Sequence, residues 1–124
     1  MKIQESAEMY LETILVLQKR NGAVRSIDIA NEMEFSKPSV SYAMKQFRNN
    51  NLIIMDEDGL ITLTPEGLSI AERVYERHQY LTKYLIALGV SPDVADEDAC
   101  RIEHVISDES FLKIKEHLTI LEKK

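Results

Sequence analysis

One stretch decides the fold: residues 26–50, which read SIDIANEMEFSKPSVSYAMKQFRNN. Ser26 has a side chain suited to an N-cap and predicts a short helix over residues 27–33. Ser36 predicts the start of a second helix, which has Pro38 in its first turn and runs to about Asn50. Two short helices joined by a tight turn are typical of a helix-turn-helix.

The residues on either side extend this motif. Two β-type runs, residues 52–55 and 60–63, flank a turn that ends in Asp58-Gly59, and Asp-Gly is a strong hairpin signal. A hairpin directly after a helix-turn-helix is a wing. Before the motif, apolar residues at helical spacing predict another helix over residues 4–20. We therefore expect a winged helix-turn-helix domain over residues 1–64.

The second half of the chain is helical in pattern. Thr64-Pro65-Glu66 predicts the start of a long helix that continues to Gly89. Ser91 and Ser107 predict the starts of two further helices, the last over about residues 109–121. The fold class is therefore mainly α, with a winged helix-turn-helix followed by an α-helical domain over residues 65–124.

Composition narrows the function. The formal net charge is −6, which argues against a protein that coats nucleic acid through bulk charge. However, no acidic residue occurs between positions 35 and 55, where Lys37, Lys45 and Arg48 stand. An acidic chain with one basic, acid-free stretch can bind DNA through that stretch. A single cysteine and the lack of a membrane-spanning run predict a cytoplasmic protein with no membrane partner.

The candidate DNA-binding residues are polar or small and lie mainly near the start of the second helix of the motif. That end of the helix enters the major groove in helix-turn-helix proteins, and hydroxyls, backbone N–H groups and cations suit phosphate oxygens. The candidates are Arg25, Ser36, Lys37, Pro38, Ser39, Ser41, Tyr42, Lys45 and Gln46. The acidic wing tip, residues 56–58, repels phosphates and is not expected to enter a groove.

A second pattern lies at residues 100–104. If this stretch is helical, Cys100, Glu103 and His104 point from one face. A thiolate, a carboxylate and an imidazole together suit a transition metal such as Fe²⁺, Co²⁺, Ni²⁺ or Zn²⁺ better than Ca²⁺ or Mg²⁺. The plainer alternative is a buried cysteine beside a solvated Glu-His pair.

The chain resembles the diphtheria toxin repressor and manganese transport regulator family of metal-dependent transcription regulators. The segments that carry the likeness are residues 8–14 (EMYLETI), 36–41 (SKPSVS), 63–67 (LTPEG), 77–78 (RH) and 100–108 (CRIEHVISD). Together these segments span nearly the whole chain, and their order indicates the short form of the family, without an SH3-like domain.

The resemblance implies a metal-activated repressor of iron or manganese homeostasis genes. It implies a homodimer on a palindromic double-stranded DNA operator, with the apolar faces of the last three helices at the dimer interface. By position, it implies six metal ligands: Met9, Glu12, His78, Cys100, Glu103 and His104. Without the resemblance, Met9 reads as core filler, and Glu12 and His78 read as solvated side chains.

The chain departs from both branches of that family. Sulfur residues stand at Met9 and Cys100, as in iron-type members, whereas Glu12 is a manganese-type feature. Softer ligands favour Fe²⁺, Co²⁺, Ni²⁺ or Zn²⁺ over Mn²⁺, so Fe²⁺ and Mn²⁺ both stay open as the physiological metal. Thr82 stands where the iron-type second site has a glutamate, and Asp96 can replace that glutamate only in part.

Two other functions fit part of the pattern. One is a winged-helix regulator that senses oxidation at Cys100. The other is a small zinc hydrolase, because Cys-x-x-Glu-His resembles an inverted zinc-peptidase motif. A hydrolase would need a large pocket-forming domain, which the sequence does not indicate. A redox sensor would leave the other candidate ligands unexplained. We therefore expect a regulator that is not an enzyme.

Overall fold

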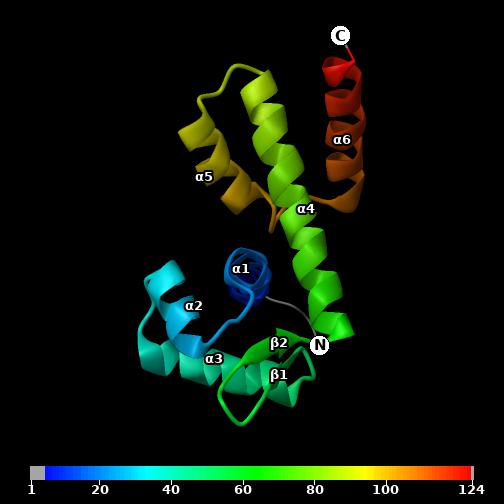
Figure 1. The fold of residues 1–124 in the computed structure, drawn as a ribbon. Helices are drawn as coiled ribbons and strands as arrows, with labels where there is room; N and C mark the ends of the chain where they lie inside the picture. The colour runs from blue at the N-terminus through cyan, green and yellow to red at the C-terminus, as the bar shows by residue number, and fades with distance from the viewer. Residues whose placement is uncertain (1–4, 124) are drawn as a thin grey trace. The chain divides into compact units, whose positions relative to one another are not determined.

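The computed structural model describes residues 5–123. The chain divides into two compact units, Met1–Glu72 and Arg73–Lys124, and each is described by itself. The first contains three helices, a two-stranded hairpin and the start of a fourth helix (Figure 1). The second contains the rest of that helix and two more. The predicted mainly helical fold is confirmed.

Three helices form the body of the first unit: α1 (Glu5–Asn21), α2 (Ser26–Met33) and α3 (Lys37–Asn49). Each helix directs its apolar face inward. Tyr10 of α1 meets Phe47 of α3 edge to face, with ring centroids 5.7 Å apart. The buried core also includes Leu11, Ile14, Val24, Ile29, Val40, Met44, Ile53 and Ile61.

The helix starts show one prediction confirmed and one wrong. Ser36 caps α3, since its hydroxyl accepts a hydrogen bond from the Ser39 N–H at 3.3 Å. Ser26, by contrast, is the first helical residue of α2 and not its cap. Arg25 takes the cap position, because the carboxylate of Asp28 accepts a hydrogen bond from the Arg25 backbone N–H at 2.9 Å. The reciprocal bond runs from the Asp28 N–H to the Arg25 carbonyl.

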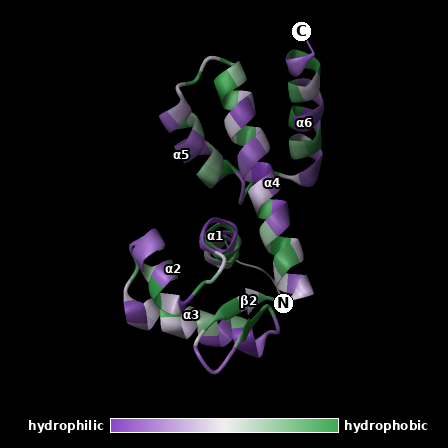
Figure 2. Cartoon of the chain, viewed as in Figure 1, coloured by the Kyte–Doolittle hydropathy of each residue, from purple (hydrophilic) through white to green (hydrophobic). Residues whose placement is uncertain are grey.

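The predicted wing is present as an antiparallel hairpin. Strand β1 (Ile53–Met55) pairs with β2 (Ile61–Leu63), with Ile54 opposite Thr62. The turn is held by Asp56, whose Oδ1 accepts hydrogen bonds from two backbone N–H groups at 2.9 Å. The turn is hydrophilic, whereas hydrophobic residues lie along β2 (Figure 2).

Helix α4 (Pro65–Ala87) begins in the first unit and continues into the second. The Thr64 hydroxyl accepts a hydrogen bond from the Gly67 N–H at 3.1 Å and so caps the helix. Gly67 lies directly against the preceding backbone, because a Cβ there would be 2.0 Å from the Leu52 carbonyl oxygen. The domain boundary predicted after residue 64 stays a prediction, since the two compact units divide inside α4.

The second unit packs α5 (Pro92–Ile102) and α6 (Asp108–Glu122) against the later part of α4. Aromatic contacts join α4 to α6: the Tyr80 and Phe111 rings meet edge to face, and the Tyr84 hydroxyl lies 2.8 Å from His117 Nδ1. The apolar core of this unit is made of Val74, Leu81, Ala95, Ala99 and Leu118.

Helix α5 ends earlier than the sequence suggested. Its last residue is Ile102, and Glu103 keeps helical geometry and donates its N–H to the Ala99 carbonyl at 3.0 Å. His104 lies beyond the helix, in the turn that leads to α6. Beyond the end of α5, Arg77 donates hydrogen bonds to the carbonyls of Glu103 and Ile106. The turn is therefore stabilised by a side chain from α4.

Candidate metal centre and DNA interface

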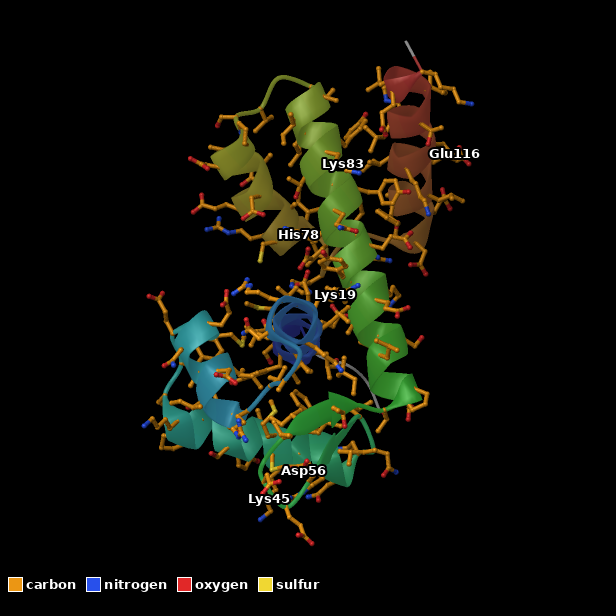
Figure 3. All side chains as sticks on the ribbon, in the orientation of Figure 1. Lys19, Lys45, Asp56, His78, Lys83 and Glu116 are labelled. Atoms are coloured by element: carbon orange, nitrogen blue, oxygen red, sulfur yellow. The ribbon has the colours of Figure 1, made fainter. Side chains whose placement is uncertain are left out.

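The exposed face of α3 carries most of the candidate DNA-binding residues. Tyr42 is 67% exposed, and Lys45 projects from the same helix (Figure 3). Ser36, Lys37, Pro38, Ser39 and Ser41 are exposed too, and Gln46 is half-buried. The Ser36 and Ser39 hydroxyls lie 2.8 Å apart, so part of their hydrogen-bonding capacity stabilises the helix start. The structure thus brings eight of the nine candidates onto one helix and its cap.

Arg25 stands apart from α3. Its Nε donates a hydrogen bond to the Asp58 carbonyl oxygen at 3.4 Å, which joins the start of α2 to the tip of the wing. The side chain is exposed. The acidic wing tip therefore lies near a cation of its own unit, and this contact competes with the phosphate contact proposed for Arg25.

Two hollows in the first unit are lined partly by Ser26, which the sequence did not single out for DNA binding. A hollow between α2, α3 and β1 is lined by Ser26, Ser41, Met44, Lys45, Arg48 and Met55. A neighbouring hollow is lined by Ser26, Ile27, Lys37 and Ser41. Ser26 and Ser41 border both. The sequence signal for Ser26 is its place at the start of a helix, where unpaired backbone N–H groups suit phosphate oxygens.

The metal candidates of the second unit converge on Glu103, whose side chain is fully buried. Its Oε2 lies 2.9 Å from His78 Nδ1, and its Oε1 lies 3.4 Å from His104 Nε2. Oε1 accepts no hydrogen bond from any residue that the structure describes. Burial of a carboxylate oxygen is costly unless it has a compensating partner. His78 belongs to α4, where its side chain can be found in Figure 3.

His78 has a second acidic neighbour. Its Nε2 lies 2.8 Å from Asp96 Oδ1, so the ring lies between two carboxylates that α5 and its end supply. The two differ in exposure: the Asp96 side chain is 66% exposed, whereas that of Glu103 is buried. His78 itself is 23% exposed at its side chain.

Arg77 holds the turn that carries Glu103 and His104. This residue is 5% exposed, and its guanidinium donates to the Glu103 carbonyl at 3.3 Å and to the Ile106 carbonyl at 2.7 Å. It also pairs with the carboxylate of Asp108 and lies over the Phe111 ring, 5.5 Å from the centroid. The sequence alone indicated no site role for Arg77. Its buried charge shows only in the structure.

The other three metal candidates are half-buried residues of helices α5 and α1. Cys100 is half-buried in the last turn of α5, one turn before Glu103. Met9 and Glu12 are half-buried on α1, three residues apart and therefore on the same side of that helix. Met9 and Glu12 belong to the first unit, and the other four belong to the second.

The donor set of the second unit fits a divalent transition metal. Two imidazoles flank one buried carboxylate that has an oxygen without a hydrogen bond, and a thiol lies one turn away. Imidazole ligands suit Zn²⁺, Cu²⁺, Fe²⁺ and Ni²⁺, whereas Ca²⁺ and Mg²⁺ take oxygen ligands.

Within residues 5–123, no helix is long and apolar enough to cross a membrane.

Two family models match the chain. "Iron dependent repressor, N-terminal DNA binding domain" covers residues 2–65, and "Iron dependent repressor, metal binding and dimerisation domain" covers residues 64–124. Among similar proteins, the transcriptional regulator MntR of Escherichia coli O6:H1 is 36% identical over 87% of this chain and 70% of its own length. The diphtheria toxin repressor of Corynebacterium diphtheriae is 31% identical over 85% of this chain and 47% of its own length.

Solved structures agree. The manganese regulator SloR matches 96% of this chain and 55% of its own, with a TM-score of 0.79 and 28% identity. A manganese-dependent transcriptional repressor in complex with manganese matches 91% of this chain and 52% of its own, with a TM-score of 0.82 and 27% identity. The chain thus spans about half the length of these two proteins. It belongs to the iron-dependent repressor family of transcriptional regulators, with the DNA-binding domain followed by the metal-binding and dimerisation domain.

Proposed function

We propose that this chain is a repressor that binds DNA when it holds a divalent transition metal, and that it controls iron or manganese homeostasis genes. The observation that carries the proposal is the buried carboxylate of Glu103 between the imidazoles of His78 and His104. A structural role alone leaves one oxygen of that carboxylate without a hydrogen bond, whereas a cation ligated there satisfies it.

In this proposal, His78, Glu103 and His104 supply two nitrogens and one oxygen to the metal. Cys100 from α5 and Met9 and Glu12 from α1 complete the ligand set. Ligation by residues of both units restricts how freely the DNA-binding unit moves relative to the other. The metal favours the DNA-competent arrangement only to the extent that it binds that arrangement more tightly, and about 5.5 kcal/mol shifts a population from 1:99 to 99:1.

The metal is expected to be Fe²⁺ or Mn²⁺. The names of the relatives include manganese regulators and iron-dependent repressors, and this chain mixes their ligand types. Sulfur at Met9 and Cys100 favours softer ions, while Glu12 and Glu103 supply carboxylates that suit Mn²⁺. Co²⁺, Ni²⁺ and Zn²⁺ fit the same nitrogen ligands and serve as probes.

The DNA partner is proposed to be a palindromic operator bound by a homodimer in the cytoplasm. Exposed apolar residues in the second unit, among them Leu88, Val94 and Leu112, supply surface for a second copy. In each copy, the N-terminal end of α3 enters the major groove, with Lys37 and Lys45 near phosphates. We propose no catalytic role for Glu103.

The test is operator binding measured with and without metal under anaerobic conditions. Operator fragments are selected from a random duplex library with the Mn²⁺-loaded protein. Affinity is then measured with Fe²⁺, Mn²⁺, Co²⁺ or Zn²⁺ and with a chelator. We expect at least a tenfold gain with the physiological metal, which corresponds to about 1.4 kcal/mol of coupling.

Two variants locate the site. Glu103→Gln with His104→Ala should abolish the metal-dependent gain and leave the weak metal-free binding unchanged. Lys45→Gln should weaken binding with or without metal and lower the salt dependence by about one phosphate contact. Equal operator affinity with metal and with chelator in the wild-type protein rules out the metal-sensor proposal.

A further inference from the structure

His78 presents both ring nitrogens to carboxylates of its own unit, and the two carboxylates are unequal. Nδ1 lies 2.9 Å from the buried Glu103, and Nε2 lies 2.8 Å from Asp96. A neutral imidazole carries one proton, so one nitrogen donates and the other offers a lone pair to a metal. The identity of the metal-binding nitrogen therefore depends on which of the two carboxylates accepts a hydrogen bond from the ring N–H.

Burial identifies the side on which a metal fits. The side chains of Glu103 and His104 are 0% and 1% exposed, and both lie on the Nδ1 side of the imidazole through Glu103. The Asp96 side chain, on the Nε2 side, is 66% exposed. Thr82, one turn after His78 on α4, offers only a hydroxyl where a further carboxylate would be needed for a second ion. Among the described residues, the buried Glu103 carboxylate lies at Nδ1, and the buried His104 imidazole lies against the other oxygen of that carboxylate.

We infer that Asp96 is a positioning residue: it accepts a hydrogen bond from the His78 Nε2–H and thereby fixes the tautomer in which Nδ1 faces the metal beside Glu103. The inference rests on the proposed function. A carboxylate that accepts from the outer nitrogen of a ligating histidine orients the ring and raises its basicity. Asp96 therefore contributes to metal affinity without touching the metal.

Substitution separates this role from direct ligation. Loss of such an outer carboxylate typically lowers metal affinity about 10–100-fold, so we expect a loss in that range for Asp96→Ala with Zn²⁺ or Mn²⁺. Asp96→Asn keeps an oxygen that accepts from Nε2–H and should restore affinity to within about threefold of wild type. Asp98→Ala removes another exposed acid from α5 and serves as the matched control, with a change below about twofold.

The tautomer itself can be observed. In protein with ¹⁵N-labelled histidine and bound Zn²⁺, the His78 spectrum should show a protonated Nε2 and a metal-bound Nδ1. In Asp96→Ala, the Nε2–H signal should exchange faster with solvent. A metal-bound Nε2 overturns the inference, and so does an Asp96→Asn variant that loses as much affinity as Glu103→Gln, because Asp96 would then be a ligand.

The two proposals fail in different ways. If Zn²⁺ does not perturb the His78 and His104 signals at all, the metal site of the proposed function is wrong. If Zn²⁺ binds there with unchanged affinity in Asp96→Ala, the site stands and only the role of Asp96 is wrong.

Discussion

The two units bury charged side chains to different extents. In the first, helices α1–α3 and the hairpin enclose mainly aliphatic and aromatic side chains together with the buried Glu8, and the polar residues of α3 lie outside. The second unit buries Arg77 and Glu103 together with much of His78 and His104. Burial of apolar area stabilises a fold without requiring specific polar partners, whereas buried charges are costly and need matched partners. The first unit therefore relies mainly on apolar burial for its stability, whereas the second unit relies more on matched partners for its buried charges.

The largest effect should come from the apolar core of the first unit. Ile29 is fully buried on α2, and Ile29→Ala should lower the free energy of unfolding by about 2–5 kcal/mol through lost transfer energy and a residual cavity. Ile27→Ala, at a position that is 40% exposed, is the matched control and should cost well under half as much. Hydrogen exchange should show lost protection in α2 and α3. A loss that Zn²⁺ reverses would contradict the contrast between the units.

The next effect concerns the buried guanidinium. Arg77→Met keeps much of the apolar stem but leaves the carbonyls of Glu103 and Ile106 without their donor, which should cost about 3 kcal/mol. Lys113→Met, at a side chain that is 71% exposed, is the control. Thermal unfolding gives the overall cost, and hydrogen exchange in residues 103–107 locates it. If protection there equals wild type, Arg77 does not hold the turn.

Metal should act on the second unit first. Zn²⁺ at about 100 times its dissociation constant should stabilise the protein by about 2.7 kcal/mol, because only the folded state presents the site. Glu103→Gln preserves size and should remove most of this gain. The same titration on Glu97→Gln, an exposed acid on α5, should leave the gain intact. Equal metal stabilisation in both variants would show that Glu103 is not a ligand.

The smallest effect on stability should come from removing a surface ion pair between α4 and α6. Lys115 donates a hydrogen bond to Glu76 at 2.8 Å, and this bond raises the pKa of Lys115 above its ordinary value of 10.5. Since the folded pKa is the higher one, the stabilisation is complete below pH 10.5 and is lost as pH rises through the raised pKa. The pair is exposed, so Lys115→Met should cost less than about 1 kcal/mol near neutral pH.

Alkaline pH affects the other unit as well. Burial raises the pKa of Tyr10, because the phenolate is disfavoured away from water, and this also lowers stability at high pH. The Lys115 contribution is therefore read as the difference between wild type and Lys115→Met across the same pH series. A constant difference above pH 10.5 would show that the pair does not titrate there.

The sequence predicts structure correctly where neighbouring residues dictate it. The Ser36 cap with Pro38, the Asp-Gly hairpin and the Thr64-Pro65 helix start all came from residues within a few positions of one another. It was wrong by one residue at Ser26, because the choice of cap depends on the Arg25 backbone and the Asp28 carboxylate together. Helix ends depend on such details of geometry.

The candidate metal site was only partly readable in this way. The spacing placed Cys100 near Glu103, but it continued the helix through His104. Nothing in the local sequence shows that Arg77 donates hydrogen bonds to the carbonyls of Glu103 and Ile106, which lie 26 and 29 positions away. The pairing of Asp96 with His78 across 18 positions is equally invisible to local patterns. Contacts between distant segments decide which polar residues are buried, and only a fold supplies them.

Gly67 limits how this sequence can diverge. A glycine inside a helix lowers the stability of the protein by about 0.5–1 kcal/mol relative to alanine. Mutation and selection for stability would therefore replace it if space allowed. Space does not allow it, since any β-carbon would be 2.0 Å from the Leu52 carbonyl oxygen. In a saturation library, position 67 should tolerate no substitution. Gly22 differs, because a β-carbon there would meet no atom within 4 Å, and its positive φ of 81° should accept asparagine.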